Sequence, residues 1–178
     1  MDREPISVSP LEEPKANSLV TVPGSFGANF RFLKPMHGRI GEMRVTGSIA
    51  YELAMTARGV LQYSVTTGPH LWDVAAGIVL VVEAGGIAMR RKRGGGVKSL
   101  FGSPRWEPVE SLVPSWHSGQ TTAKELRRWT ATMVLGSPRV VRYVTSNMRP
   151  RLILRHRLAR SAHRLFKRPP RGKNKVPG

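Results

Sequence analysis

The segment His70-Leu-Trp-Asp-Val-Ala-Ala-Gly-Ile-Val-Leu-Val-Val-Glu-Ala-Gly-Gly86 places an acidic residue at the start of an apolar helix that ends in two glycines. Asp73 is one of only two aspartates in the chain, and the other is Asp2. A carboxylate in the first turn of a helix can cap the free backbone N–H groups there. It can equally bind a metal ion or face a phosphate-bearing ligand. The residues alone leave both interpretations of Asp73 open.

The composition sets limits on the class of protein. A chain of 178 residues that is 40% apolar can bury one sizeable core, so we expect one main domain. The absence of cysteine excludes disulfides, thiolate metal sites and thiol nucleophiles. No apolar run approaches the roughly 18 residues of a membrane-spanning helix, and the first residues lack the pattern of a secretory signal. We therefore expect a cytoplasmic protein.

The positive charge is concentrated near the C-terminus. The net charge is +18, and 13 of the 29 basic residues lie between positions 139 and 178, where there is no acidic residue. The rest of the chain has the charge balance of an ordinary globular domain. The extreme basicity therefore describes the C-terminal part and does not indicate the activity of the core.

Apolar periodicity and turn residues predict alternating strands and helices joined by short connections, which is typical of an α/β layer. Ser48 is well placed as the N-cap of one helix, and Gly59 supplies its stop. Arg90 to Gly96 is expected to form an exposed turn. The predicted strands cover 18–24, 43–46, 60–66 and 87–89, and the predicted helices cover 28–36, 48–59, 72–84, 121–135, 139–145 and 149–168.

Several motifs follow one another in a characteristic order. They are Pro5-Ile-Ser-Val-Ser9, Gly47-Ser-Ile-Ala50, Ala57-Arg-Gly59, the segment from His70 to Gly77, and Glu83-Ala-Gly-Gly86. This series resembles the C-terminal half of the inositol monophosphatases, which are magnesium-dependent phosphomonoesterases. The resemblance covers about residues 3–90.

The resemblance implies a layered α/β (α+β-like) sandwich for the core and divides the chain accordingly. We expect an irregular lead-in over 1–17 and an inositol monophosphatase-like C-terminal subdomain over 18–90. After it we expect an irregular segment with Gly, Pro and Trp over 91–118. We then expect a basic helical extension over 119–168 and a disordered tail over 169–178.

The resemblance also implies the site residues and the cofactor. It makes Asp73 a Mg²⁺ ligand, and it places Gly47, Ser48 and Ile49 along a phosphorylated small-molecule substrate. Mg²⁺ favours hard oxygen ligands, and helix N-termini favour anions, so the residue types suit a sugar or polyol phosphate. His70 could contact the substrate or could be a histidine satisfied at a turn. Trp72 and the small residues after it are expected to let the helix pack closely on a sheet.

The chain also departs from the family pattern. The family's first metal-binding signature, Asp-Pro-Ile/Leu-Asp-Gly-Thr, does not occur here. Gln62 stands where many members have aspartate, and Thr66 stands where inositol-specific members have glutamate. We therefore interpret the chain as the second half of such a hydrolase: a fragment, a product begun at an internal methionine, or a decayed copy. We expect it to be inactive, or nearly so, unless an N-terminal half or another copy completes it.

A second interpretation is that the protein has no catalytic role. The basic residues of 149–178 could bind a polyanion or an anionic membrane surface. A solvated helix that packs its apolar stripe on the domain is a further alternative for this segment.

Overall fold

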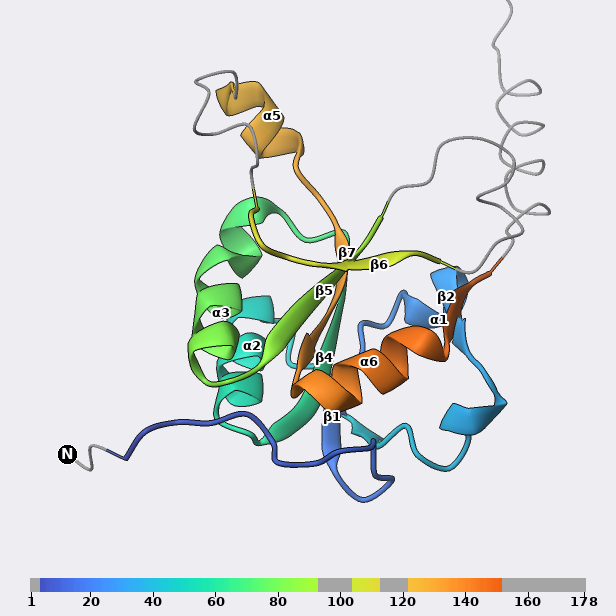
Figure 1. Cartoon of the computed structure of the whole chain (residues 1–178). Coiled ribbons are helices and arrows are strands. Elements are labelled where there is room, and N and C mark those ends of the chain that lie inside the picture. The colour runs from blue at the N-terminus through green and yellow to red at the C-terminus, as the bar shows by residue number, and fades with distance from the viewer. Residues whose placement is uncertain (1–3, 93–103, 113–121, 152–178) are drawn as a thin grey trace, which may run out of the picture.

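One six-stranded mixed sheet organises the structure and carries helices on both of its faces (Figure 1). The computed structural model describes residues 4–92, 104–112 and 122–151. The strands of this sheet are β1 (Leu19–Thr21), β3 (Glu42–Met43), β4 (Leu61–Thr67), β5 (Ile87–Arg91), β6 (Trp106–Pro108) and β7 (Thr132–Gly136). A separate antiparallel pair is formed by β2 (Phe30–Phe32) and β8 (Met148–Pro150).

The strand order in the main sheet is β3-β1-β4-β7-β5-β6. Strands β3, β1 and β4 run parallel to one another. Strand β7 is antiparallel to both of its neighbours, β4 and β5, and β6 is antiparallel to β5. The carboxyl ends of β3, β1, β4 and β5 therefore lie at one edge of the sheet, together with the amino end of β7.

The helices are α1 (Phe26–Asn29), the 3-10 helix η1 (Lys34–Met36), α2 (Ile49–Ala57), α3 (Leu71–Glu83), α5 (Ala123–Arg128) and α6 (Pro138–Ser146). Helices α2 and α3 lie side by side on one face of the sheet, and α6 lies on the other (Figure 1). Successive side chains of β7 point to opposite faces of the sheet. Met133 and Leu135 pack toward α2 and α3, whereas Val134 packs toward α6. The predicted α/β layered fold is confirmed.

Two helical predictions are wrong. Residues 28–36 form the end of α1, strand β2 and η1 rather than one helix. Within 122–135, the described part of the predicted helix, only Ala123–Arg128 is helical, and the chain then becomes the interior strand β7. The apolar run from Met133 to Leu135 fits the space between β4 and β5, where it pairs on both sides. Burial between two strands overrides the local helical spacing.

The sheet therefore continues past residue 90, where the predicted subdomain ended. Strand β7 and helix α6 come from the predicted extension and complete the core. Arg90 and Arg91 lie in β5 and not in an exposed turn. Residues 4–17 contain no helix or strand. Of the predicted helix 149–168, residues 149–150 belong to β8, whereas 152–168 and the predicted tail fall outside the described residues. No helix in the described ranges is long and apolar enough to cross a bilayer.

Candidate functional site

The N-termini of α2 and α3 lie at the same edge of the sheet. Strands β3 and β4 point in the same direction, because both run parallel to β1. After β3 the chain continues through 44–48 into α2, and after β4 it continues through 68–70 into α3. In open sheets of this kind, ligands bind outside the carboxyl ends of parallel strands. The structure thus brings Gly47, Ser48 and Ile49 to the edge that also holds His70 and Asp73.

The start of α2 is shaped by the turn that precedes it. Gly47 has a φ of +80°, a left-handed conformation that glycine adopts without strain. The Ser48 hydroxyl accepts a hydrogen bond from the Tyr51 N–H at 3.4 Å, which confirms Ser48 as the N-cap. Gly47 and Ser48 are exposed, and Ile49 is half-buried. These residues can therefore meet a ligand from solvent.

A buried glutamate that the sequence analysis did not single out holds this turn in place. Glu52 is only 7% exposed, and its Oε1 accepts hydrogen bonds from the Thr46 N–H at 3.0 Å and the Thr46 hydroxyl at 2.9 Å. Both bonds tie the residue just before Gly47 to the body of α2. The only feature of the sequence that could have pointed to Glu52 is an acidic residue on the otherwise apolar side of the helix. Glu52 therefore positions the turn through a buried carboxylate.

Asp73 is the third residue of α3 and is half-buried. Its Oδ2 accepts a hydrogen bond from the His70 N–H at 2.9 Å. The carboxylate thus satisfies a backbone donor at the helix start, as the capping interpretation predicts. Within the described residues, Oδ1 accepts no hydrogen bond. One carboxylate oxygen is therefore left for a cation or a solvent molecule.

His70 and Trp72 lie beside Asp73 and are both exposed. Their rings stack, with centroids 4.6 Å apart and planes 14° from parallel. The prediction that Trp72 packs on a sheet is wrong, because its side chain is 61% exposed. It lies on the face of α3 opposite the buried Val74, Gly77, Ile78 and Val81. Gly77 does permit close packing, but against Leu53 of α2.

Gln62 is structural in this fold, and Thr66 is buried. The Gln62 amide accepts a hydrogen bond from the Lys15 N–H at 2.9 Å and donates to the Lys15 carbonyl at 2.8 Å. These bonds fasten the N-terminal segment to β4. Thr66 is 3% exposed, and its hydroxyl makes no hydrogen bond within the described part of the chain. Neither side chain is presented to a ligand at the edge.

The described residues do not supply a complete magnesium site. They contain no cluster of three or more His, Asp or Glu side chains able to surround a metal ion. Mg²⁺ is usually held by one or two carboxylates, by waters and by substrate phosphates, in octahedral geometry. Asp73 could provide one of these oxygens. The donor set near it therefore fits one wall of a metal–phosphate site.

Comparisons with known proteins find relatives of this chain in one family. The sequence model of the inositol monophosphatase family matches residues 3–130. The probable inositol 1-monophosphatase ImpA of Mycobacterium tuberculosis is 35% identical over 104 residues, which cover 53% of this chain and 34% of that protein. The fructose-1,6-bisphosphatase/inositol-1-monophosphatase of Thermotoga maritima is 37% identical over 57 residues, or 32% of this chain and 22% of that protein.

The fold also matches solved structures. An inositol monophosphatase from Anabaena (Nostoc) sp. PCC 7120 superposes with a TM-score of 0.50 at 19% identity, over 82% of this chain and 49% of that one. The chain spans about a third or less of the curated relatives that it matches and about half of this solved structure. The family model covers well over half of the sequence, and the chain therefore belongs to the inositol monophosphatase family.

Proposed function

We propose that this chain supplies one side of the active site of a Mg²⁺-dependent phosphatase, the side that contains Asp73. The enzyme would hydrolyse a sugar or polyol phosphomonoester. The observation that carries the proposal is the convergence of the α2 and α3 N-termini at one sheet edge, with Asp73 at one of them. Free backbone N–H groups at two helix starts favour an anion between them. The membership of the chain in a phosphatase family supports the same reaction class.

Each predicted site residue has a role in this proposal. Gly47, Ser48 and Ile49 would lie along the substrate, close to its phosphate. Asp73 contributes one oxygen to a Mg²⁺ ion, and His70 borders the substrate from the next loop. When bound, the metal would polarise the phosphate and activate a water molecule. Glu52 holds the Thr46–Gly47 turn, and within that turn the Ser48 N–H donates to the Thr46 hydroxyl at 3.3 Å.

We further propose that the isolated chain hydrolyses phosphomonoesters slowly or not at all. The sequence holds only one aspartate besides Asp2 and lacks the Asp-Pro-x-Asp-Gly-Thr signature that supplies most metal ligands in the family. Each lost 1.36 kcal/mol of transition-state stabilisation lowers the rate about tenfold. A site without most of its carboxylates is therefore expected to lose many orders of magnitude in rate.

A second polypeptide could supply the missing metal ligands. The solvent-exposed sides of helices α2 and α3 are where we propose that it binds. Tyr51 of α2 and Trp72, Val79 and Leu80 of α3 are large apolar side chains exposed to solvent. Large apolar side chains left exposed can mark an interface. An N-terminal half like that of the longer relatives is the proposed occupant of this face, and a second copy of the chain is the alternative.

Hydrolysis assays test the proposal. Phosphate release from inositol 1-phosphate and fructose 1,6-bisphosphate would be measured with and without Mg²⁺ for the wild-type chain and for Asp73→Asn. Neither protein alone is expected to exceed the buffer rate. Adding the part of the M. tuberculosis relative that this chain does not match should restore Mg²⁺-stimulated release with the wild type but not with Asp73→Asn. Equal restoration by both proteins would remove Asp73 from the site.

The alternative, non-catalytic function is binding of a polyanion or an anionic membrane through 149–178. Most of that segment, 152–178, lies outside the described residues. Binding to heparin with steep salt dependence, lost when 149–178 are removed, would support it. The same binding retained after their removal would contradict it.

A further inference from the structure

The antiparallel ribbon formed by β2 and β8 places two arginines directly opposite each other. Its register sets Arg31 of β2 against Arg149 of β8. Side chains opposed in this way share one face of the ribbon and lie about 5 Å apart at Cβ, so the like charges repel each other. Phe30 and Met148, which alternate with them along the strands, are buried in the core. The face that carries the two arginines is therefore the outer one.

A third arginine extends this outer face. The Arg151 N–H donates to the Asn29 carbonyl at 2.8 Å, so the pairing continues one residue past the end of β8. Residues two apart in an extended chain point to the same side, which places Arg151 next to Arg149. Arg31 and Arg151 are exposed, and Arg149 is half-buried.

The end of helix α6 adjoins the ribbon (Figure 1). Nη1 of Arg149 donates to the Ser146 carbonyl at 2.7 Å and to the Met148 carbonyl at 3.0 Å. Ser146 is the last residue of α6, and Arg142 lies one turn before it on the same exposed side of the helix. Arg149 thus links the helix to the ribbon. We call these four residues the arginine cluster: Arg31, Arg142, Arg149 and Arg151.

The arginine cluster has no acidic partner in the described part of the chain. None of its members forms an ion pair there. Every acidic side chain of the protein except Asp2 lies in those described residues. The sequence itself holds no Asp or Glu at 14–41 or at 126–178. The stretches of sequence that build the cluster therefore contribute no negative charge to it.

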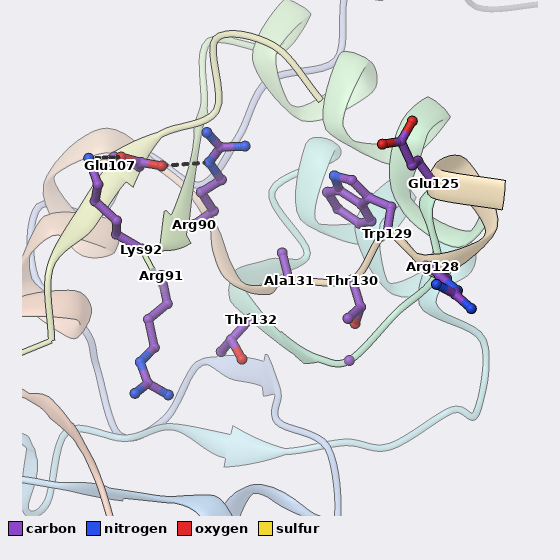
Figure 2. A pocket seen from close by; sticks show the side chains of 11 residues that line it. Arg90, Arg91, Lys92, Glu107, Glu125, Arg128, Trp129, Thr130, Ala131 and Thr132 are labelled. Atoms are coloured by element: carbon purple, nitrogen blue, oxygen red, sulfur yellow. Dashed lines mark hydrogen bonds and ion pairs between the residues drawn. The ribbon is translucent and has the colours of Figure 1, made fainter. Parts of the chain in front are cut away.

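Cations at the β5–β6 edge of the main sheet are, by contrast, offset by a carboxylate. In the cavity that Figure 2 shows, Glu107 pairs with Arg90 at 2.8 Å and with Lys92 at 3.4 Å. The repulsion between Arg31 and Arg149 has no such relief within the described residues. An anion from outside the chain would supply it.

The surroundings of the cluster indicate which polyanion fits. None of the large apolar side chains that the structure leaves exposed lies in 14–41 or 126–151. The cluster therefore offers nothing to insert into a membrane and no exposed ring to stack on the bases of a single strand. Beyond residue 151 the sequence adds nine more Lys or Arg and no acidic residue. Contacts from cations alone suit the phosphate backbone of a duplex.

We propose that the arginine cluster binds the phosphate backbone of a double-stranded nucleic acid without reading its sequence. Each guanidinium would meet phosphate oxygens through its planar fork, and a phosphate beside Arg31 and Arg149 would offset their repulsion. The proposal does not rest on the phosphatase assignment, because the ribbon packs with α6 on the sheet face opposite α2 and α3. It also differs from binding through 149–178, because Arg31 and Arg142 lie outside that segment.

The test measures binding of the full chain to a short, fluorescein-labelled DNA duplex of mixed sequence by fluorescence anisotropy, over a series of NaCl concentrations. Each phosphate contact contributes about 0.9 to the slope of log K against log salt concentration. The double variant Arg31→Gln/Arg142→Gln should therefore bind more weakly and lose about 1.8 of the slope. Absence of wild-type binding to the duplex at near-physiological salt would overturn the proposal.

A second double variant provides the matched control. Arg58 at the C-cap of α2 and Arg127 of α5 are exposed, form no ion pair within the described ranges and lie outside the cluster. Arg58→Gln/Arg127→Gln makes the same change in net charge and should alter the slope by less than about 0.5. Equal losses in both double variants would show that net charge alone attracts the duplex. No loss in either would assign the binding to cations outside the cluster, and each of these results would overturn the proposal.

Two further measurements exclude another partner and a structural role. Vesicles of phosphatidylcholine and phosphatidylserine should not distinguish the wild type from Arg31→Gln/Arg142→Gln. A loss seen with vesicles but not with the duplex would assign the cluster to a membrane surface and overturn the proposal. Arg31→Gln alone should unfold at the wild-type urea concentration or above it, because it removes a like charge from the ribbon. Earlier unfolding with unchanged duplex binding would make Arg31 a structural residue, which would also overturn the proposal.

Discussion

Gly77 of α3 approaches Leu53 of α2 so closely that a Cβ at position 77 would lie 2.4 Å from Leu53 Cδ1 and 2.6 Å from Leu53 Cβ. Gly77→Ala should therefore destabilise the protein, although alanine is the better helix former. Overpacking costs about 1–3 kcal/mol, which exceeds the roughly 1 kcal/mol gained in helix propensity. Urea unfolding would measure the difference. Gly27→Ala is the control, because nothing lies within 4 Å of a Cβ there, and it should be neutral or slightly stabilising.

Asp73 should contribute to stability as well as to the proposed site. Asp73→Ala removes the acceptor for the His70 N–H and a negative charge from the first turn of α3. A loss of about 1 kcal/mol in the free energy of unfolding is expected. Asp73→Asn keeps an acceptor and should lose less. If both variants unfold at the wild-type urea concentration, the hydrogen bond to His70 does not stabilise the helix.

The pair formed by Glu52 and Thr46 should behave as one unit. Glu52→Gln, Thr46→Val and the double variant form a cycle whose coupling free energy is expected to be about 1 kcal/mol or more, because the carboxylate is buried. Amide chemical shifts of Gly47 and Ser48 should move in both single variants. Additive effects on unfolding, with unmoved Gly47 and Ser48 signals, would show that Glu52 does not hold the turn.

The Glu107 carboxylate of β6 should titrate in a way that reports its contact with Arg90 of β5. The hydrogen bond from Arg90 lowers its pKa below the usual value of a glutamate. Because the pKa is lower in the folded state, this group stabilises the fold above its unfolded pKa of about 4.3, and the contribution is lost as the pH falls through the folded pKa. Side-chain carbon NMR should show a titration midpoint below about 4.3 that rises in Arg90→Gln. A midpoint unchanged by Arg90→Gln would remove Arg90 as the cause.

The sequence predicted the half of the fold in which local signals and packing agree. Helices α2 and α3 have clear N-terminal signals and one buried face each, so their positions were predicted to within a residue or two. Strand β7 was missed because its five residues follow a helical turn, and its strand character depends on pairing with β4 and β5. Long-range pairing of this kind leaves no trace in local periodicity.

The sequence predicted the motifs that contribute to the candidate site but not their arrangement in space. The order of the motifs around Ser48 and Asp73 placed them in one family, but their common edge follows from the parallel pairing of β3, β1 and β4. Glu52 could not be found in this way. Burial of its carboxylate depends on contacts between segments that lie apart in the sequence.

Paramagnetic broadening of backbone amides by Mn²⁺, added as a stand-in for Mg²⁺ with inorganic phosphate, tests the central claim most directly. If the helix starts and Asp73 form one wall of a metal–phosphate site, the amide signals of 47–49 and 71–74 should broaden first. That broadening should be absent in Asp73→Asn. Broadening confined to other acidic residues, or identical in Asp73→Asn, would contradict the assignment of this edge.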